Sequence, residues 1–224
     1  MRKTVVTITG IRPDFIRMAN IFRLLDLNFK HVLIHTGQHY DDLLSGSFFN
    51  DLQIRKPDYV LSTGKQTSNH FEQLAYLSVE IPKLFASENI NPDVILFLGD
   101  SNSVGAAFPL KKAGYRIGHI EAGMRSTDKR MLEEINRTVC DVCSDVFFVY
   151  HDDYREHLLR ENIRNNIFVV GNTIVEPCLQ FLDTSRLLET PKRNDCILLD
   201  IHRPENFNYP DRLRSIIQFA NTCI

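Results

Sequence analysis

Residues 94–101 read Val94-Ile95-Leu96-Phe97-Leu98-Gly99-Asp100-Ser101, an apolar run followed by a small-residue turn. A run that is apolar at every position is typical of a strand in a parallel sheet covered by helices on both faces. Five further segments are expected to be strands of the same sheet: residues 5–9, 31–36, 116–120, 146–150 and 167–170. Helical patterns alternate with them, at residues 13–27, 41–52, 71–87, 103–113, 132–142 and 152–161. The alternation predicts an α/β fold with a Rossmann-like, doubly wound parallel sheet.

The pattern changes after residue 170. Gly171-Asn172-Thr173 follow the last strand of the series, and the remaining elements are expected at residues 174–187 (helix), 196–200 (strand) and 211–221 (helix). So few elements bury too little apolar surface to form a layered domain by themselves. We therefore predict a first domain at residues 1–170. Residues 171–224 are expected to form a hinge and the opening part of a second, truncated Rossmann-like domain.

Composition excludes several classes of protein. The 224 residues are 43% hydrophobic and 24% charged, values that are ordinary for a globular protein and exclude a disordered chain. A net charge of -2 provides no overall basic field for nucleic acid or an anionic membrane. No apolar run approaches the roughly 18 residues of a membrane helix, and we do not expect the first residues to form a signal peptide. We expect a cytoplasmic protein without nucleic-acid or membrane partners.

The five cysteines are Cys140, Cys143, Cys178, Cys196 and Cys223. An odd, scattered set argues against a disulfide framework. The first two have the C-x-x-C spacing of zinc and redox sites, but neither a second such pair nor a nearby pair of histidines accompanies them. An apolar row with helical spacing includes one of them: Ile135, Val139, Val142, Cys143 and Val146. We interpret this row as the core face of a helix and expect no metal site.

Polar residues follow the predicted strands at the points where ligands of open α/β sheets bind. These segments are residues 10–14, 36–39, 99–103, 121–126 and 202–206. The first segment lacks the G-x-G-x-x-G fingerprint of dinucleotide-binding proteins, and the sequence contains no P-loop motif. Free N–H groups of the first helical turn, together with Arg12, are suited to a phosphate or diphosphate. The alternative for Arg12 is an ion pair with a surface acid.

Charged residues also open the helix at residues 132–142. Glu133, Arg137 and Asp141 are spaced by four residues and form one polar stripe. A solvated face with ion pairs is the usual explanation of such a stripe. The combination of Asp100, Glu121 and Glu133 with several arginines nevertheless places many charges at one sheet edge, which favours a catalytic site.

Seven motifs occur in the order found in one enzyme family. They are Gly10-Ile11-Arg12-Pro13-Asp14, Thr36-Gly37-Gln38-His39, Gly99-Asp100-Ser101, His119-Ile120-Glu121-Ala122-Gly123-Met124-Arg125, Glu133-Glu134-Ile135-Asn136-Arg137, Gly171-Asn172-Thr173 and His202-Arg203. In these motifs the chain resembles the UDP-N-acetylglucosamine 2-epimerases. The resemblance implies a GT-B fold, with a UDP-sugar bound between two Rossmann-like domains. It also implies a homodimer and a non-hydrolysing enzyme without cofactor or metal.

The resemblance implies roles for ten residues. Four match the family's catalytic positions: Asp100, Glu121, Glu133 and His202. Six match positions near the nucleotide sugar: Arg12, Arg17, Gln38, His39, Arg125 and Arg137. The implied reaction inverts C2 of a UDP-2-acetamido sugar by eliminating UDP to a 2-acetamidoglycal and adding it back. Carboxylates must then stabilise charge at C1 and move a proton at C2, and cations must hold the departing diphosphate.

Some residues depart from the family pattern. Ile11 and Asp14 replace the usual Thr and Glu of the first motif, and Leu132 replaces a Pro. The motifs at residues 99–103 and 202–206 are similar to the branch that acts on UDP-6-deoxy-L-sugars for surface polysaccharides. The family's diphosphate-binding motif of the second domain does not occur in the sequence, so we expect these 224 residues alone to be inactive. A hydrolysing epimerase that releases N-acetylmannosamine, and a non-catalytic nucleotide-sugar-binding fragment, remain alternatives.

Overall fold

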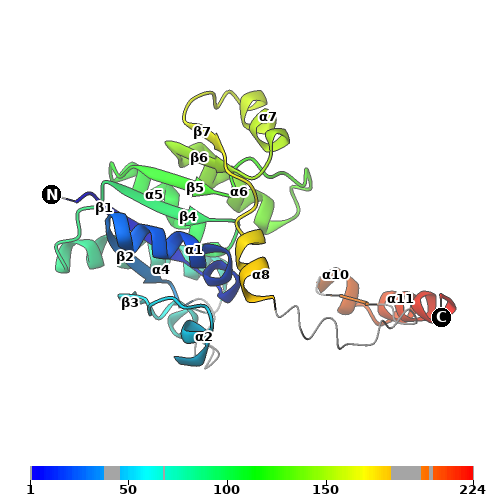
Figure 1. The fold of residues 1–224 in the computed structure, drawn as a ribbon. Coiled ribbons are helices and arrows are strands. Elements are labelled where there is room, and N and C mark those ends of the chain that lie inside the picture. The colour runs from blue at the N-terminus through cyan, green and yellow to red at the C-terminus, as the bar shows by residue number, and fades with distance from the viewer. Residues whose placement is uncertain (1, 38–45, 68, 183–197, 202–203, 224) are drawn as a thin grey trace. The chain divides into compact units, whose positions relative to one another are not determined.

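The computed structural model describes residues 2–37, 46–67, 69–182, 198–201 and 204–223 (Figure 1). The chain divides into two compact units, Met1–Phe181 and Leu182–Ile224. The first unit contains the whole described sheet and most of the predicted site residues. Within the described residues, no helix has both the length and the apolar character needed to span a membrane.

Seven parallel strands form the sheet of the first unit. They are β1 (Thr4–Thr9), β2 (Lys30–His35), β3 (Tyr59–Val60), β4 (Val94–Leu98), β5 (Ile117–Ile120), β6 (Val146–Val149) and β7 (Ile167–Val169). Their order is β3-β2-β1-β4-β5-β6-β7, so the chain reverses direction across the sheet between β1 and β4. The doubly wound parallel sheet and all six of its predicted strands are confirmed. The two-residue strand β3 was not predicted, because so short an edge strand leaves no periodic pattern.

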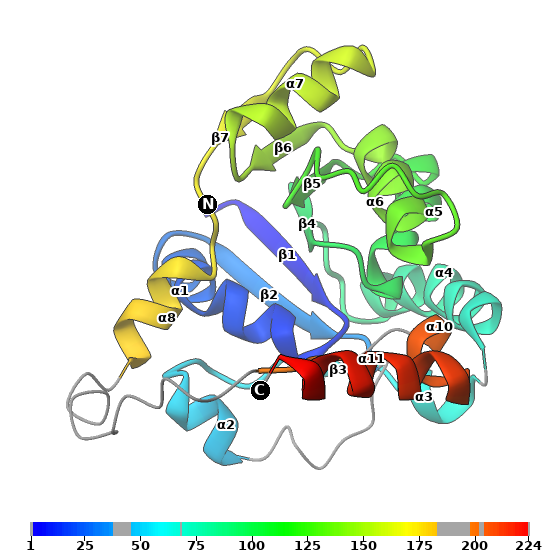
Figure 2. The ribbon, with the colours of Figure 1, turned by 90° about the vertical axis from the view of Figure 1, so that its right-hand side faces the viewer.

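Helices cover both faces of this sheet. Their bounds are α1 (Arg12–Asn28), α2 (Gly46–Asp51), α3 (Thr63–Gln66), α4 (His70–Ser87), the 3₁₀ helix η1 (Asn102–Ala106), α5 (Ala107–Lys112), α6 (Leu132–Cys143), α7 (Asp152–Arg160) and α8 (Val175–Phe181). Figure 2 shows α4, α5 and α6 on one side of the sheet and α1 and α8 on the other. The predicted helix at residues 103–113 is therefore a 3₁₀ turn followed by a short α-helix.

The two largest apolar clusters lie on opposite faces of the sheet, between the strands and these helices. Val6 and Ile8 of β1 pack with α4, α5 and α6, whereas Phe15 and Phe22 of α1 pack against Leu33 of β2. Successive strand residues point to opposite faces, so β2 contributes Val32 and Ile34 to the first cluster and Leu33 to the second. Burial on both faces explains why β4 is apolar at every position.

The orientation of α6 differs from the prediction. Cys140 and Cys143 are buried in the core, which confirms their interpretation as core residues. Ile135 and Val142 are instead 48% and 71% exposed, so Val139 and Cys143 are the helical residues of the predicted row that face the core. The buried face of α6 carries Asp141 as well as the two cysteines, because Asp141 has charged partners beneath the helix.

The second unit contains α10 (Pro204–Phe207) and α11 (Pro210–Thr222), and α11 confirms the helix predicted at residues 211–221. Residues 198–200 are not a strand, so the prediction for residues 196–200 is wrong for this part, and residues 196–197 lie outside the described residues. A strand exists only where another strand pairs with it, and the described part of this unit offers none. The predicted domain boundary at residue 170 stays a prediction, although α8 belongs to the first compact unit.

Candidate functional site

Loops at the carboxyl ends of β1 and β4 meet where the strand order reverses. Gly10, directly after β1, packs so closely that a Cβ atom there would lie 2.6 Å from Oγ of Ser101 and 2.8 Å from Oγ of Ser103. Those two serine hydroxyls are 2.6 Å apart and hydrogen-bonded to each other. A glycine is therefore required at position 10 for the two loops to pack together. In open α/β sheets this reversal point is the usual ligand site.

Asp14 and Arg17 project from the first turns of α1 toward this edge. Asp14 accepts hydrogen bonds from the backbone N–H groups of Gly10 (2.8 Å) and Ile11 (3.1 Å), so it closes the helix N-terminus that Ile11 cannot cap. Burial raises the pKa of Asp14 to about 6, against the opposing effect of these bonds and of Arg17. Asp14 also lies 3.4 Å from the Arg17 guanidinium. The first turn of α1 thus fixes one cation at the edge of the sheet.

Glu121 is the partner of that cation. Its Oε2 accepts a hydrogen bond from Nη1 of Arg17 and another, at 3.3 Å, from the hydroxyl of Tyr150. Burial raises the pKa of Glu121, the nearby Asp100 raises it further, and Arg17 opposes the shift. The backbone of Glu121 has a φ of 74°, a conformation that costs free energy for a non-glycine residue and clusters at functional sites. The fold therefore holds a buried carboxylate on a strained backbone directly after β5.

Asp100 and Arg137 form a second ion pair beside the first. The Arg137 guanidinium, from α6, donates to Oδ2 of Asp100, which follows β4. Asn136 donates to the Asp100 backbone carbonyl at 2.9 Å, so two adjacent residues of α6 hold the β4 turn. Structure thus brings together four residues that the sequence assigned to the site: Arg17, Asp100, Glu121 and Arg137.

The glutamates at the start of α6 differ sharply in environment. Glu134 is buried and accepts hydrogen bonds from the backbone N–H of Ser126 (2.8 Å), the Ser126 hydroxyl (3.0 Å) and the N–H of Thr127 (3.2 Å). Glu133 is exposed. The predicted stripe of Glu133, Arg137 and Asp141 therefore does not share one environment, because Glu133 is exposed, Arg137 is half-buried and Asp141 is buried. The catalytic role assigned to Glu133 stays a prediction.

His119 and Asp141 form a buried ion pair next to these residues. The ring of His119, on β5, contacts Oδ1 of Asp141 (2.6 Å) and the carbonyl oxygen of Gly99 (2.8 Å), so both its nitrogens face acceptors. Burial opposes a charge on His119, but the neighbouring Cys140 and Asp141 outweigh it and hold its pKa well above the ordinary value. Protonated His119 donates to both acceptors and so links α6 to the turn that carries Asp100.

Arg125 also contacts Asp141 of this ion pair. It lies 2.8 Å from Oδ2 of Asp141 and 2.6 Å from Oε2 of Glu161, on the turn after α7. Asp141 also accepts a hydrogen bond from the N–H of Gly123 at 3.0 Å. The structure therefore does not place Arg125 with Arg17 and Arg137. Its predicted role at the nucleotide sugar stays a prediction.

Four further predicted site residues are not part of the cluster of Arg17, Asp100, Glu121 and Arg137 as the structure describes it. Arg12 is exposed, with its guanidinium 4.7 Å from the centre of the Phe48 ring. Gln38, His39 and His202 lie outside the described residues. Within the described ranges, no group of three His, Cys, Asp or Glu side chains has the arrangement of a metal site.

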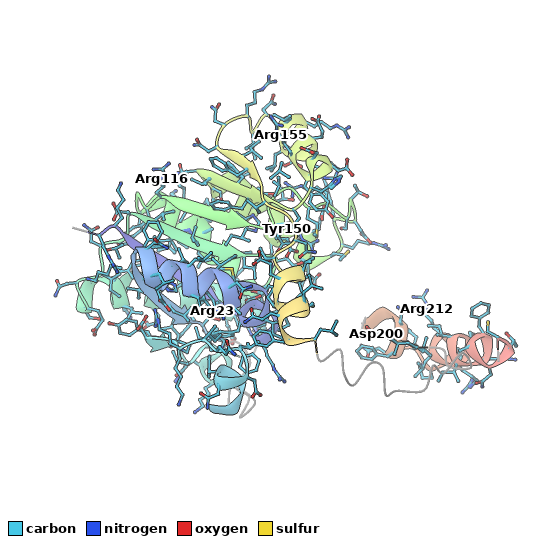
Figure 3. All side chains as sticks on the ribbon, viewed as in Figure 1. Arg23, Arg116, Tyr150, Arg155, Asp200 and Arg212 are labelled. Atoms are coloured by element: carbon cyan, nitrogen blue, oxygen red, sulfur yellow. The ribbon has the colours of Figure 1, made fainter. Side chains whose placement is uncertain are left out.

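Two residues of the cluster, Asp14 and Tyr150, are not among the predicted site residues. Asp14 lies in a motif that we identified, but its role is local, since it caps α1 and contacts Arg17. Tyr150 is the first residue after β6, and Figure 3 shows it beside the segment that enters α8. The predicted strand at residues 146–150 includes Tyr150, whereas β6 ends at Val149. The rule that polar residues follow strand ends would have found it with the boundary one residue earlier.

Comparison with known proteins gives one consistent family. A family model described as UDP-N-acetylglucosamine 2-epimerase matches residues 25–223. The UDP-N-acetylglucosamine 2-epimerase of Methanocaldococcus jannaschii is 38% identical over 222 residues, which cover 94% of this chain and 60% of that protein. The UDP-2,3-diacetamido-2,3-dideoxy-D-glucuronate 2-epimerase of Pseudomonas aeruginosa is 33% identical, with coverages of 97% and 62%. The chain spans about 60% of the length of the curated relatives it matches.

Solved structures agree with the sequence comparison. The crystal structure of the M. jannaschii UDP-GlcNAc 2-epimerase in complex with UDP-GlcNAc and UDP matches with a TM-score of 0.81 and 36% identity, covering 96% of this chain and 61% of that one. The Neisseria meningitidis enzyme bound to UDP-GlcNAc matches with a TM-score of 0.72 and 26% identity, covering 83% and 51%. The GT-B-like fold class that the resemblance implied is confirmed. The chain belongs to the UDP-N-acetylglucosamine 2-epimerase family.

Proposed function

We propose that the intact protein inverts the configuration at C2 of a UDP-2-acetamido sugar. The observation that carries this proposal is the cluster of two carboxylates, Asp100 and Glu121, each paired with an arginine where the strand order reverses. The names of the relatives support the substrate class, since they specify UDP-N-acetylglucosamine and a UDP-diacetamido-glucuronate. A 6-deoxy-L-sugar as substrate, and a role in polysaccharide synthesis, remain predictions from the sequence.

The chemistry explains why such a cluster is needed. The hydrogen at C2 is not next to a carbonyl, so removing it alone would produce an unstabilised carbanion. In the proposed path the C2 proton moves to a protein base and the bond between C1 and the diphosphate oxygen breaks, which gives a 2-acetamidoglycal and UDP. A proton then adds to the opposite face of C2 while the diphosphate oxygen bonds to C1 again. The path is redox-neutral, and we propose that it requires neither a metal nor a redox cofactor.

The described residues suit different steps of this path. Burial raises the pKa of the Glu121 carboxyl above the ordinary glutamate value, which makes it a better proton acceptor and favours it as an acid–base group. We propose that Asp100 stabilises positive charge at C1. Arg17 and Arg137 neutralise these carboxylates before substrate binds and are available to the departing diphosphate. Arg12, Gln38, His39, Arg125, Glu133 and His202 retain their sequence-based roles as predictions.

Hydrogen exchange at C2 tests the reaction. We expect the intact protein, incubated with UDP-N-acetylglucosamine in deuterated water, to produce the C2 epimer with deuterium at C2, because a proton taken by the protein exchanges with solvent. Proton NMR and mass spectrometry measure it, and parallel reactions with UDP-6-deoxy-L- and UDP-diacetamido sugars define the substrate. Product without deuterium would contradict elimination, and release of free sugar and UDP would indicate the hydrolysing alternative. No reaction with any of these sugars would leave the non-catalytic reading.

We also propose that the protein is a homodimer and that it acts in the cytoplasm. Three helices on one side of the sheet, α4, α5 and α6, carry exposed apolar side chains: Phe71, Val79, Phe108, Ile135 and Val142. Exposed apolar side chains on helices of one layer favour an interface between subunits on that side of the sheet. The described cysteines, Cys140, Cys143, Cys178 and Cys223, are free thiols, which fits a reducing compartment.

Light scattering of the intact protein tests the dimer. We expect a dimeric mass for the natural protein and a monomer for Val142→Glu, because a charge buried between apolar surfaces is costly. Leu27→Glu is the matched control. Leu27 is about as exposed as Val142, at 69% against 71%, but lies on α1 across the sheet. A monomeric natural protein, or dissociation by Leu27→Glu instead, would overturn this proposal.

A further inference from the structure

Tyr150 occupies an unusual position at the end of β6. Its ring is buried in the same apolar cluster as Phe15 and Ile120, and only 8% of the residue is exposed. Its hydroxyl emerges at the carboxyl edge of the sheet, beside Glu121, and Figure 3 shows the residue next to the chain that enters α8. A buried tyrosine hydroxyl needs hydrogen-bond partners, and those that it finds define its role.

Two partners share this hydroxyl. Oε2 of Glu121 lies at 3.3 Å and Oγ1 of Thr173 at 2.8 Å. A tyrosine hydroxyl carries one hydrogen, so it donates to one partner and accepts from the other. While Glu121 is ionised, Tyr150 donates to the carboxylate and Thr173 donates to Tyr150. If Glu121 takes up a proton, both hydrogen bonds can reverse. The donor and acceptor roles of Tyr150 and Thr173 therefore follow the charge of Glu121.

Tyr150 does not itself exchange protons in the neutral range. Burial and the Glu121 charge raise its pKa to about 12, so it remains protonated. Other groups around Glu121 are charged or titratable, and they come from several elements: Asp14 and Arg17 from α1, Asp100 after β4, His119 on β5 and Arg137 on α6. Tyr150 adds a neutral donor to this set, fixed by the packing of its ring.

Thr173 connects the hydroxyl to the segment that leaves the sheet. It lies between β7 and α8, in the stretch predicted to be the hinge. The following helix is attached to α1 through hydrogen bonds from Asn20 to Glu176 (3.1 Å) and from Arg23 to Gln180 (2.9 Å). The position of Thr173 is therefore defined by the packing of α8 on α1.

We propose that Tyr150 is a positioning residue for Glu121, whose carboxylate it holds and stabilises through a hydroxyl that Thr173 orients. The inference rests on the proposed function, in which Glu121 exchanges a proton with C2 of the sugar. Removing a donor from an ionised carboxylate makes the carboxylate easier to protonate. Substitution of Tyr150 therefore affects the titration of Glu121 more than the binding of the nucleotide.

Tyr150→Phe in the intact protein tests this, since it removes the oxygen and keeps the ring. We expect the limb of the kcat–pH profile that Glu121 governs to move to higher pH by about one pH unit, the equivalent of one hydrogen bond to a charged group. The direction is the same whether Glu121 must be ionised or protonated. At the optimum we expect kcat to fall about tenfold and KM to be unchanged.

Three further variants isolate the effect. Tyr59→Phe is the matched control, because the Tyr59 hydroxyl also donates to a carboxylate, Oε2 of Glu88 at 3.1 Å, but on the surface away from the site. We expect no change in its profile. Thr173→Val removes the second bond and is expected to give a smaller shift in the same direction, whereas Thr173→Ser retains the hydroxyl and restores the natural profile.

An infrared titration separates this inference from the proposed function. The carboxyl band assigned to Glu121, as the difference between the natural protein and Glu121→Gln, is followed against pH with and without Tyr150→Phe. We expect the titration to move to higher pH in the variant, whether or not a substrate has been found. An unmoved titration and profile in Tyr150→Phe, with epimerase activity intact, would overturn the role of Tyr150 alone. An absence of epimerase activity with a shifted titration would contradict the proposed function alone.

Discussion

Replacing Glu121 with Gln is expected to lower the turnover of UDP-sugar by the intact protein about 10²–10⁴-fold, the usual contribution of an acid–base group. The amide preserves size and can still hydrogen-bond to Tyr150, but it cannot exchange a proton near neutral pH. The loss should fall on kcat, measured by NMR of the two epimers. Stability should be little affected or improved. The raised pKa of Glu121 means that the fold disfavours its ionised form, and the amide carries no charge.

Two comparisons make this prediction specific. Glu80→Gln removes a carboxylate that forms a surface ion pair with Lys83 at 2.8 Å, and we expect it to leave turnover unchanged. Glu134→Gln is not a neutral control, because Glu134 accepts three hydrogen bonds from the loop at residues 126–127. If Glu121→Gln retains more than a tenth of the natural turnover, Glu121 is not the acid–base group.

Replacing Asp141 with Ala is expected to destabilise the first unit by about 3–5 kcal/mol, the usual cost of removing one partner from a buried ion pair. The substitution leaves His119 and Arg125 without their shared counter-charge and the N–H of Gly123 without its acceptor. Urea unfolding followed by circular dichroism measures the change. Asp153→Ala is the matched control, because it breaks an exposed histidine–aspartate pair, His151 and Asp153, and should have little effect. Equal midpoints for the two variants would contradict the prediction.

The same pair gives stability a defined pH dependence. The Asp141 pKa is lowered, because the attraction of His119 and the hydrogen bonds outweigh burial, so its contribution is complete above the unfolded value of about 4 and is lost as pH falls. The His119 pKa is raised, so its contribution is complete below the unfolded value of about 6.5 and is lost as pH rises toward the folded one. The difference in unfolding free energy between the natural protein and Asp141→Ala should therefore be largest between about pH 4 and 6.5.

The position of the site followed from the sequence more readily than its internal contacts. Asp100 and Glu121 each come directly after an apolar strand, and parallel strands bring their carboxyl ends to one edge. Arg17 and Arg137 were predicted near the nucleotide sugar from family motifs, and the structure pairs them with these carboxylates. Neither pairing could be derived from spacing, since the partners are separated by 104 and 37 residues along the chain.

Helix faces were the least predictable feature. The apolar residues of α6 suggested that Ile135 and Val142 face the core, yet both are exposed, while Glu134 and Asp141 are buried. Apolar periodicity identifies a core face only when burial of apolar area is the main interaction. Here buried donors and a counter-charge on neighbouring elements stabilise acids inside, and the apolar residues lie on the surface that we propose for the dimer.

The sequence by itself determined the doubly wound parallel sheet, the family and the strand ends at which the candidate site lies, because these follow from local apolar patterns and ordered motifs. Only the tertiary structure decided which charged groups pair, which glutamate of α6 is buried, and that the Tyr150 hydroxyl lies between Glu121 and Thr173. The physical reason is that burial, pKa and hydrogen-bond direction depend on neighbours brought together by folding, and a residue's own position in the chain does not specify them.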